Sequence, residues 1–215
     1  MSKKQNTNKL TFIILSAGGA SKGLPKSLIN IDDFKLIDYQ TSLIKKSYPS
    51  AEILLVCGFD SKRVVKYIHS SSVCSHIRVI DNTNFKTTSS LHSLKLAVNS
   101  MCESSIFVIH GDRILNNEAI QINDIDVPFV VIDRNNQNKE CVGIAYQDDY
   151  LRNMSYGLKT KWAGLFYVPQ SIFYPIRDCC NTLKSNSNIY ELINMINESH
   201  QFRTYDNKNI KIREV

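Results

Sequence analysis

The chain has 215 residues, of which 43% are hydrophobic and 21% are charged. This is an ordinary composition for a globular protein with a sizeable core, and it predicts a single domain over residues 1–215. No apolar run approaches the ~18 residues that a membrane-spanning helix needs, so we expect no membrane association. The net charge of +6 is spread along the chain rather than gathered with aromatic residues, which disfavours nucleic acid as a partner.

The six cysteines include no C-x-x-C pair and show no pattern of a secreted disulfide framework. We therefore expect a reduced, cytoplasmic protein.

Strands and helices alternate in the first part of the chain. Short apolar runs predict strands, and apolar residues three and four apart predict helices. In chain order we expect a strand at 11–17, a helix at 36–48, a strand at 53–58, a helix at 61–70 that Ser61 caps, a strand at 77–80, a helix at 89–101, and strands at 106–110 and 128–133. Continuously apolar strands that alternate with helices predict an α/β fold: a mostly parallel central sheet with helices on both faces, a Rossmann-like arrangement.

The pattern changes after residue 133. We expect strands at 141–146 and 165–168, helices at 169–178 and 188–198, and short strands at 202–205 and 210–212. No linker separates this part, so we expect residues 134–215 to extend the same sheet.

The first predicted strand runs into a loop of small residues and lysines, LSAGGASKGLPKSL over residues 15–28. Ligands of open α/β sheets bind at the carboxyl ends of the strands, and backbone N–H groups with lysines suit phosphates. A dinucleotide-binding G-x-G-x-x-G loop is disfavoured, because Ala20 replaces its second glycine and Pro25 interrupts the helix. A Walker A loop is disfavoured because Leu24 and Pro25 precede Lys26. A glycine-rich turn with solvated lysines is the alternative to a phosphate site.

This loop resembles the opening signature of nucleotidyltransferases with the GT-A-like, sugar-nucleotidyltransferase fold, L-A-A-G-x-G-x-R…P-K-x-L. In that family the loop wraps a nucleoside triphosphate. Lys22 stands where the family has arginine, and Lys26 matches the lysine that meets the α-phosphate, so the resemblance implies a catalytic role for both. It also implies nucleotide binding by Lys22 and Lys26 together with Leu15, Ser16, Ala17, Gly18, Gly19 and Ser21. Ala20 and Lys22 depart from the pattern, and lysine lacks the bidentate fork of arginine.

A second segment, NTNFKTTSSLHSL over residues 82–94, resembles N-P-x-Y-x-x-T-N-x-x-x-S-L of the phosphocholine-cytidylyltransferase-like branch. The resemblance implies that Thr88, Ser89 and Ser93 lie beside the nucleotide base. Hydroxyls and free N–H groups at a helix start suit base edges. A plain helix cap is the alternative, and the two roles are compatible.

Asp112 follows a buried strand and a glycine, which suits a Mg²⁺ site because Mg²⁺ prefers oxygen ligands with room for water and phosphate. The family has G-D here, which implies a catalytic, metal-binding Asp112. The resemblance also implies a second metal ligand late in the chain, for which Asp206 is the candidate. The segment Trp162-Ala163-Gly164 resembles an acceptor-side segment of the family, which implies that Lys161 and Gly164 meet the acceptor.

Together these motifs imply a nucleotide-binding half over residues 10–133 and an acceptor-side half over 134–215. The expected activity is Mg²⁺-dependent transfer of a nucleoside monophosphate from an NTP, with CTP favoured, to a small phosphomonoester such as phosphocholine or a sugar 1-phosphate. Pyrophosphate would leave. The alternatives are a GT-A-like glycosyltransferase, against which the missing D-x-D argues, a molybdenum-cofactor-type nucleotidyltransferase, and a catalytically degenerate nucleotide-binding protein.

Overall fold

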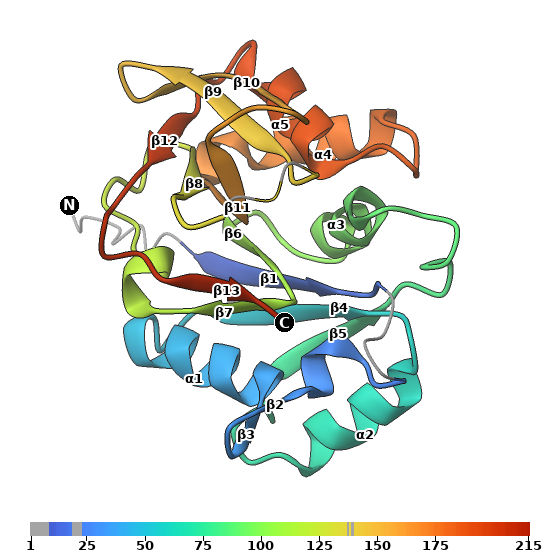
Figure 1. Cartoon of the computed structure of the whole chain (residues 1–215). Helices are drawn as coiled ribbons and strands as arrows, with labels where there is room; N and C mark the ends of the chain where they lie inside the picture. Colours follow the sequence, from blue (N-terminus) through green and yellow to red (C-terminus); the bar gives the residue numbers. More distant parts are fainter. Residues whose placement is uncertain (1–8, 19–22, 137, 139) are drawn as a thin grey trace, which may run out of the picture.

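The computed structural model describes residues 9–18, 23–136, 138 and 140–215. A nine-stranded sheet divides the molecule, and helices cover both of its faces (Figure 1). The strands of this sheet are β1 (Leu10–Ser16), β4 (Glu52–Cys57), β5 (Ile77–Asp81), β6 (Ser105–His110), β8 (Phe129–Asp133), β9 (Gly143–Gln147), β10 (Tyr150–Ser155), β11 (Lys161–Val168) and β12 (Arg203–Tyr205). Two small two-stranded ladders pair β2 (Asn30–Ile31) with β3 (Phe34–Lys35), and β7 (Arg113–Leu115) with β13 (Ile212–Glu214).

The helices are α1 (Leu36–Ser47), α2 (Ser61–Ser70), α3 (Ser90–Asn99), α4 (Phe173–Thr182) and α5 (Ile189–Asn197). Short 3₁₀ helices span Lys26–Leu28, Asn117–Ile120 and Gln170–Ile172. Within the described residues, no helix has the length and apolarity to cross a membrane.

The sheet order is β5-β4-β1-β6-β11-β8-β12-β10-β9. The first four strands in this order are parallel to one another. Strand β11 is antiparallel to its two neighbours, β6 and β8. Strands β8 and β12 are parallel to each other and run in the same direction as β6. The predicted α/β fold is confirmed. Strands from both parts of the chain share one sheet, because β11 inserts between β6 and β8.

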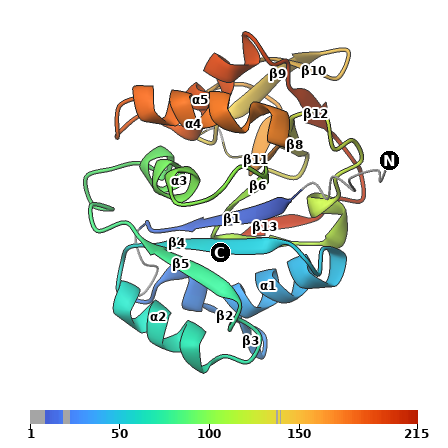
Figure 2. The ribbon, with the colours of Figure 1, turned by 180° about the vertical axis from the view of Figure 1, so that it is seen from behind.

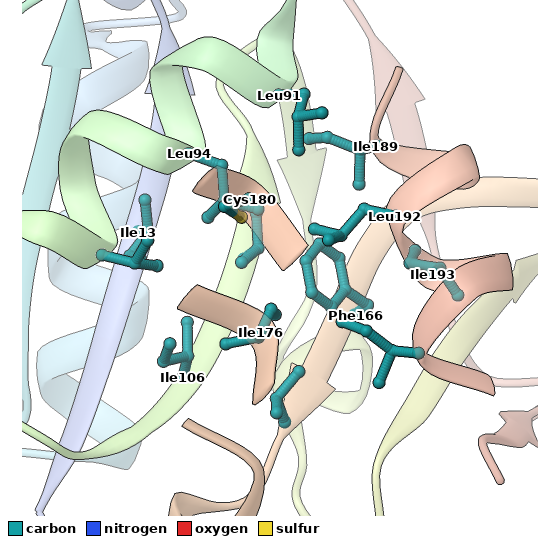
Figure 3. Close-up of a cluster of buried hydrophobic side chains, with 14 of the residues drawn as sticks. Ile13, Leu91, Leu94, Ile106, Phe166, Ile176, Cys180, Ile189, Leu192 and Ile193 are labelled. Carbon is teal, nitrogen blue, oxygen red and sulfur yellow. The ribbon is translucent and has the colours of Figure 1, made fainter. Parts of the chain in front are cut away.

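Each central strand buries both of its faces. In β1, Phe12 and Ile14 point into the layer under α1 and α2, whereas Ile13 and Leu15 point into the layer under α3, α4 and α5. Figure 2, seen from behind, shows the same division of the helices. Figure 3 shows the second layer, where α3, α4 and α5 converge on the sheet. Its labelled side chains are Ile13, Leu91, Leu94, Ile106, Phe166, Ile176, Cys180, Ile189, Leu192 and Ile193. Burying one such aliphatic side chain stabilises the fold by roughly 1.5–3 kcal/mol.

The helix ends follow local chemistry. Ser89 caps α3, because its Oγ accepts a hydrogen bond from the backbone N–H of Leu91. Asn188 and Glu191 form a reciprocal capping box at the start of α5. The prediction that Ser61 caps α2 is wrong: Asp60 precedes that helix in a left-handed conformation, and the Ser61 hydroxyl donates to Asp81 at 2.9 Å instead.

Gly58 lies where the chain after β4 passes under Phe85. A Cβ at this position would lie 2.7 Å from the Phe85 Cβ and 2.9 Å from the Ala17 carbonyl oxygen. We predict that Gly58→Ala lowers the free energy of unfolding by about 1–3 kcal/mol in urea titrations, because the Phe85 side chain and the Ala17 backbone would have to shift to admit the Cβ. The matched control is Gly18→Ala, whose Cβ would have nothing within 4 Å. Equal losses in the two variants would contradict this close approach.

Candidate active site

A cavity of about 170 Å³ opens at the carboxyl ends of β1 and β6. The parallel register places Leu15 beside His110, so the loops after both strands meet at this edge. The lining residues are Leu15, Ser16, Ala17, Gly18, Lys26, Asn82, Phe85, Thr88, Ser89, Ser90, Ser93, His110 and Asp112. Nine of the expected site residues are among them: Leu15, Ser16, Ala17, Gly18, Lys26, Thr88, Ser89, Ser93 and Asp112. Gly19, Ser21 and Lys22 lie outside the described residues.

Three buried polar atoms at this cavity have no hydrogen-bond partner within the described part of the chain. They are Ser16 Oγ, His110 Nε2 and Asp112 Oδ1. A buried polar atom without a partner costs about 1–3 kcal/mol, and native proteins keep few of them. Three such atoms around one cavity make it a site where water or a polar ligand can supply their partners.

Gly111 brings the two loops together. Its backbone N–H donates to the Leu15 carbonyl oxygen at 2.8 Å, and a Cβ would lie 2.6 Å from the Ser16 Cβ. Only glycine fits at this approach, and it places Asp112 directly beside the loop that follows β1.

Asp112 lies between two cations. Lys26 Nζ is 2.8 Å from Asp112 Oδ2, and Arg113 Nε is 3.4 Å from Oδ1. Burial raises the pKa of the Asp112 carboxyl, but Arg113 and Lys26 outweigh it and hold that pKa below its ordinary value. Asp112 is therefore a carboxylate at neutral pH. Lys26 is the first residue of the short helix Lys26–Leu28. Pro25 precedes this helix, and its ring restricts φ, here −53°, to a value that suits a helix start.

Arg113 and Glu214 belong to the same cluster, and the sequence analysis missed both. Strand β13 pairs with β7 so that Glu214 lies opposite Arg113, and Arg113 Nη1 is 2.5 Å from Glu214 Oε2. The backbone N–H of Val215 also donates to the Asp112 carbonyl oxygen at 3.0 Å. Glu214 is thus paired with Arg113, which in turn lies beside Asp112, the predicted metal ligand.

His110 forms a neutral wall of the cavity. Its ring packs edge-on against Trp162, with 5.1 Å between the ring centroids. Burial lowers the pKa of the His110 imidazole to about 4, with Asp112 opposing this and Arg113 and Lys26 adding to it. The positive charge near Asp112 at neutral pH therefore comes from Lys26 and Arg113.

Asn82 organises the wall opposite Asp112. It is buried, its N–H donates to the Cys57 carbonyl oxygen at 2.8 Å, and its Nδ2 donates to Thr88 Oγ1 and Ser93 Oγ at 3.2 and 3.1 Å. The asparagine that opens the 82–94 segment therefore positions two of its predicted nucleotide-binding residues.

Ser89 ties the same wall to the second part of the chain. Besides capping α3, its backbone N–H donates to the Ser185 carbonyl oxygen at 3.0 Å, and its hydroxyl donates to the Ser187 carbonyl oxygen. Ser89 therefore is a helix cap, as one of the two interpretations predicted, and it also lines the cavity.

The structure does not bring the two expected acceptor residues to this cavity. Lys161 is buried, and its Nζ donates to the carbonyl oxygens of Leu158 and Cys141 at 2.6 and 3.4 Å. Gly164 has a φ of +78° and lies under the site, where a Cβ would be 3.2 Å from His110 Cγ and from Arg113 Nε. Both residues support neighbouring parts of the site rather than line it.

Asp206 also lies apart from Asp112. It follows β12, three positions from β6 in the sheet, which corresponds to about 14 Å at the usual strand spacing. Arg134 binds it in a bidentate pair, with Nε 2.6 Å from Oδ1. Its predicted role as a metal ligand stays a prediction.

Asp112 fits a Mg²⁺ ligand. The described residues hold no group of three or more His, Cys, Asp or Glu side chains arranged for a metal ion. Mg²⁺ needs no such cage, because it binds through one or two carboxylates together with water and substrate phosphates. The buried, unpartnered Oδ1 of Asp112 at the cavity offers one such carboxylate oxygen.

Neither a protein-family model nor a curated protein sequence matches this chain. Solved structures do match it over nearly its whole length. The CTP:phosphocholine cytidylyltransferase from Streptococcus pneumoniae superposes with a TM-score of 0.77 at 17% identity, over 96% of this chain and 93% of the other. The inositol-1-phosphate CTP transferase from T. maritima gives 0.76 at 13% identity, over 97% and 89%. The nucleoside-diphosphate-sugar pyrophosphorylase from Vibrio cholerae RC9 gives 0.73 at 12% identity, over 91% of each chain.

At these identities the likeness concerns the fold. The resemblance that three short motifs carried in the sequence thus extends to the whole architecture, and the chain has the α/β fold of the NTP-dependent nucleotidyltransferases.

Proposed function

We propose that the protein is a Mg²⁺-dependent nucleotidyltransferase that transfers a nucleoside monophosphate from an NTP to a small phosphomonoester. The observation that carries this proposal is the cavity that joins Asp112, Lys26 and the small-residue loop after β1, with three unpartnered polar atoms around it. CTP is the favoured nucleotide, because two of the similar structures are named as CTP-dependent transferases. Phosphocholine and sugar 1-phosphates are the candidate acceptors.

In the proposed reaction an oxygen of the acceptor phosphate attacks the α-phosphorus of the NTP. The bond from the α-phosphorus to the bridging oxygen of the β-phosphate breaks, and pyrophosphate leaves. No covalent enzyme intermediate is required, so the residues act by positioning and by neutralising charge. Asp112 would hold Mg²⁺, which would supply charge neutralisation on the phosphates.

The other residues divide the nucleotide between them. Lys26 lies beside Asp112 and contributes a cation at the α-phosphate. The backbone around Gly18 contributes N–H groups for the remaining phosphates, and the family resemblance adds Lys22, which lies outside the described residues. Thr88 and Ser89 approach the base from the start of α3, which leaves the edge near Arg113 for the acceptor.

Pyrophosphate release tests this function. The purified protein is given CTP, UTP, ATP, GTP or dTTP with Mg²⁺ and a panel of phosphomonoesters. We expect release that requires one NTP, one acceptor and Mg²⁺, and we expect Asp112→Asn to reduce kcat by about 100-fold or more, because a carboxylate at the reacting phosphate is lost. Asp178→Asn, the same change on the exposed surface of α4, is the control. NTP binding without release under any combination would instead favour a degenerate nucleotide-binding protein.

Two carboxylates compete for the second metal-binding position, Asp206 and Glu214. Glu214 borders Asp112 through Arg113, whereas Asp206 is about three strand spacings away. We expect Glu214→Gln to raise the Mg²⁺ concentration for half-maximal activity by about 5-fold or more and Asp206→Asn to change it by less than about 2-fold, since electrostatic effects fall off with distance. The reverse order would return the metal role to Asp206.

The neutral His110 predicts a pH dependence of stability. The His110 pKa is near 4 in the folded protein and about 6.5 in the unfolded chain, so between these pH values the unfolded chain binds a proton that the folded protein does not. The folded protein therefore loses stability as the pH falls from about 6.5 to 4. We predict that the metal-free His110→Gln variant loses less stability than the wild-type protein between these pH values, by up to about 3 kcal/mol. Urea titrations at several pH values measure the difference. Parallel curves would contradict a buried neutral imidazole.

A further inference from the structure

A second cavity, of about 270 Å³, lies at the same edge of the sheet. Asp133, the last residue of β8, and Glu214, in β13, contribute to it, and Arg113 borders it directly after Asp112 of the first cavity. Its lining residues are Arg113, Asp133, Asn135, Asn136, Asn138, Cys141, Ile212 and Glu214. Asp112 of the first cavity and Arg113 of the second are in contact, with 3.4 Å between Oδ1 and Nε.

We propose that this second cavity binds the acceptor and that it selects a hydroxyl-rich phosphomonoester, a sugar phosphate or polyol phosphate, over phosphocholine. This inference rests on the proposed nucleotidyl transfer and specifies which of its candidate acceptors is used.

Arg113 places the phosphate end of the acceptor. Its Nε is buried without a hydrogen-bond partner among the described residues and lies 3.4 Å from Asp112 Oδ1, while Glu214 holds its Nη1. Gly164 leaves room beneath it, because a Cβ there would approach Nε to 3.2 Å. A phosphate bound at Arg113 would therefore lie beside Asp112, where the α-phosphate of the nucleotide is expected. This is the approach that in-line attack requires.

The rest of the cavity is built for hydroxyl groups. Three asparagine side chains each offer donors and acceptors, and the Asp133 carboxylate accepts. Two of the amide oxygens already serve the loop, because Asn136 Oδ1 accepts the Asn138 N–H at 2.8 Å and Asn138 Oδ1 accepts the Glu140 N–H at 2.9 Å. A trimethylammonium group forms no ordinary hydrogen bonds, so it would leave the remaining amide groups and the Asp133 carboxylate without a ligand partner. It binds instead to aromatic faces, and residues 134–142 contain no aromatic residue. Hydroxyls satisfy both the amides and the carboxylate.

Lys161 positions this wall. Its buried ammonium group holds the carbonyl oxygens of Cys141 and Leu158, and its backbone pairs with Asp133 across β11 and β8. Lys161 was predicted to contact the acceptor itself; instead it supports the loop that we propose contacts the acceptor.

Steady-state kinetics with the preferred NTP and Mg²⁺ test the inference. The acceptors are a hexose 1-phosphate, glycerol 3-phosphate, ribitol 5-phosphate, phosphocholine and phosphoethanolamine. We expect kcat/KM for at least one hydroxyl-rich acceptor to exceed that for either amine by about tenfold or more, the effect of one or two hydrogen bonds.

Two variants connect this preference to the cavity. Asp133→Asn keeps the oxygen that accepts the Asn135 N–H, so the turn is preserved while the charge is lost. Asn135→Ala removes one amide whose side chain makes no hydrogen bond within the described residues. We expect both to raise the KM for the hydroxyl-rich acceptor about tenfold and to change the KM for the NTP by less than about twofold. Asp178→Asn on α4 is the charge-matched control and should change neither KM.

Failure of this inference is distinguishable from failure of the proposed function. If phosphocholine or phosphoethanolamine is used as well as any sugar phosphate, or if both variants leave the acceptor KM unchanged, the transferase stands and the inference is wrong. If no acceptor supports pyrophosphate release, calorimetric titration of the hexose 1-phosphate and the two polyol phosphates into the protein alone decides. Binding that Asn135→Ala weakens would support the cavity, and no binding, or binding that the variant leaves unchanged, would overturn it.

Discussion

The position of β1 between β4 and β6 is the constraint on which the candidate site depends. Parallel pairing on both sides carries the chain to one edge of the sheet three times, with Ser16 beside Cys57 and Leu15 beside His110. Side chains far apart in the sequence, such as Lys26, Asn82 and Asp112, meet there because the strands end together. The hydrophobic layers on both faces hold this arrangement, since a shift of register by one residue would exchange the two faces of every strand.

Much of this architecture was predictable because its signals are local. The helix at 61–70 has the predicted limits, and strands β1, β4, β5, β6 and β8 lie within one residue of theirs. The short strands β2, β3 and β7 were missed. Strand β10 was also missed, because the exposed Arg152 and Asn153 in its middle interrupt any apolar run. The motif residues of the cavity were also predictable, since each follows a strand end or opens a helix.

The remaining parts of the site depend on contacts that no local pattern carries. Arg113 and Glu214 are 101 residues apart, and the sequence KIREV gives no reason to connect them. Asp206 matched a pattern through one residue, yet Arg134 binds it on the far side of β8. Lys161 was expected at the acceptor because lysines suit phosphates, but burial commits its ammonium group to carbonyl oxygens. For Arg113 and Asp206 the contacting side chain lies 101 and 72 residues away in the chain, beyond the reach of any local pattern.

The contact between Lys26 and Asp112 has a consequence for how the site fills. Without ligand, the cation and the carboxylate compensate each other, so the cavity has little net field with which to capture a lone phosphate or a lone divalent ion. If the proposed function holds, a phosphate alone would draw Lys26 away and leave Arg113 as the remaining cation beside Asp112 among the described residues. A metal ion alone would displace the lysine without giving it a new counterion. A metal–nucleotide complex would supply a partner for each at the same moment, so the pair would favour binding of the two components together.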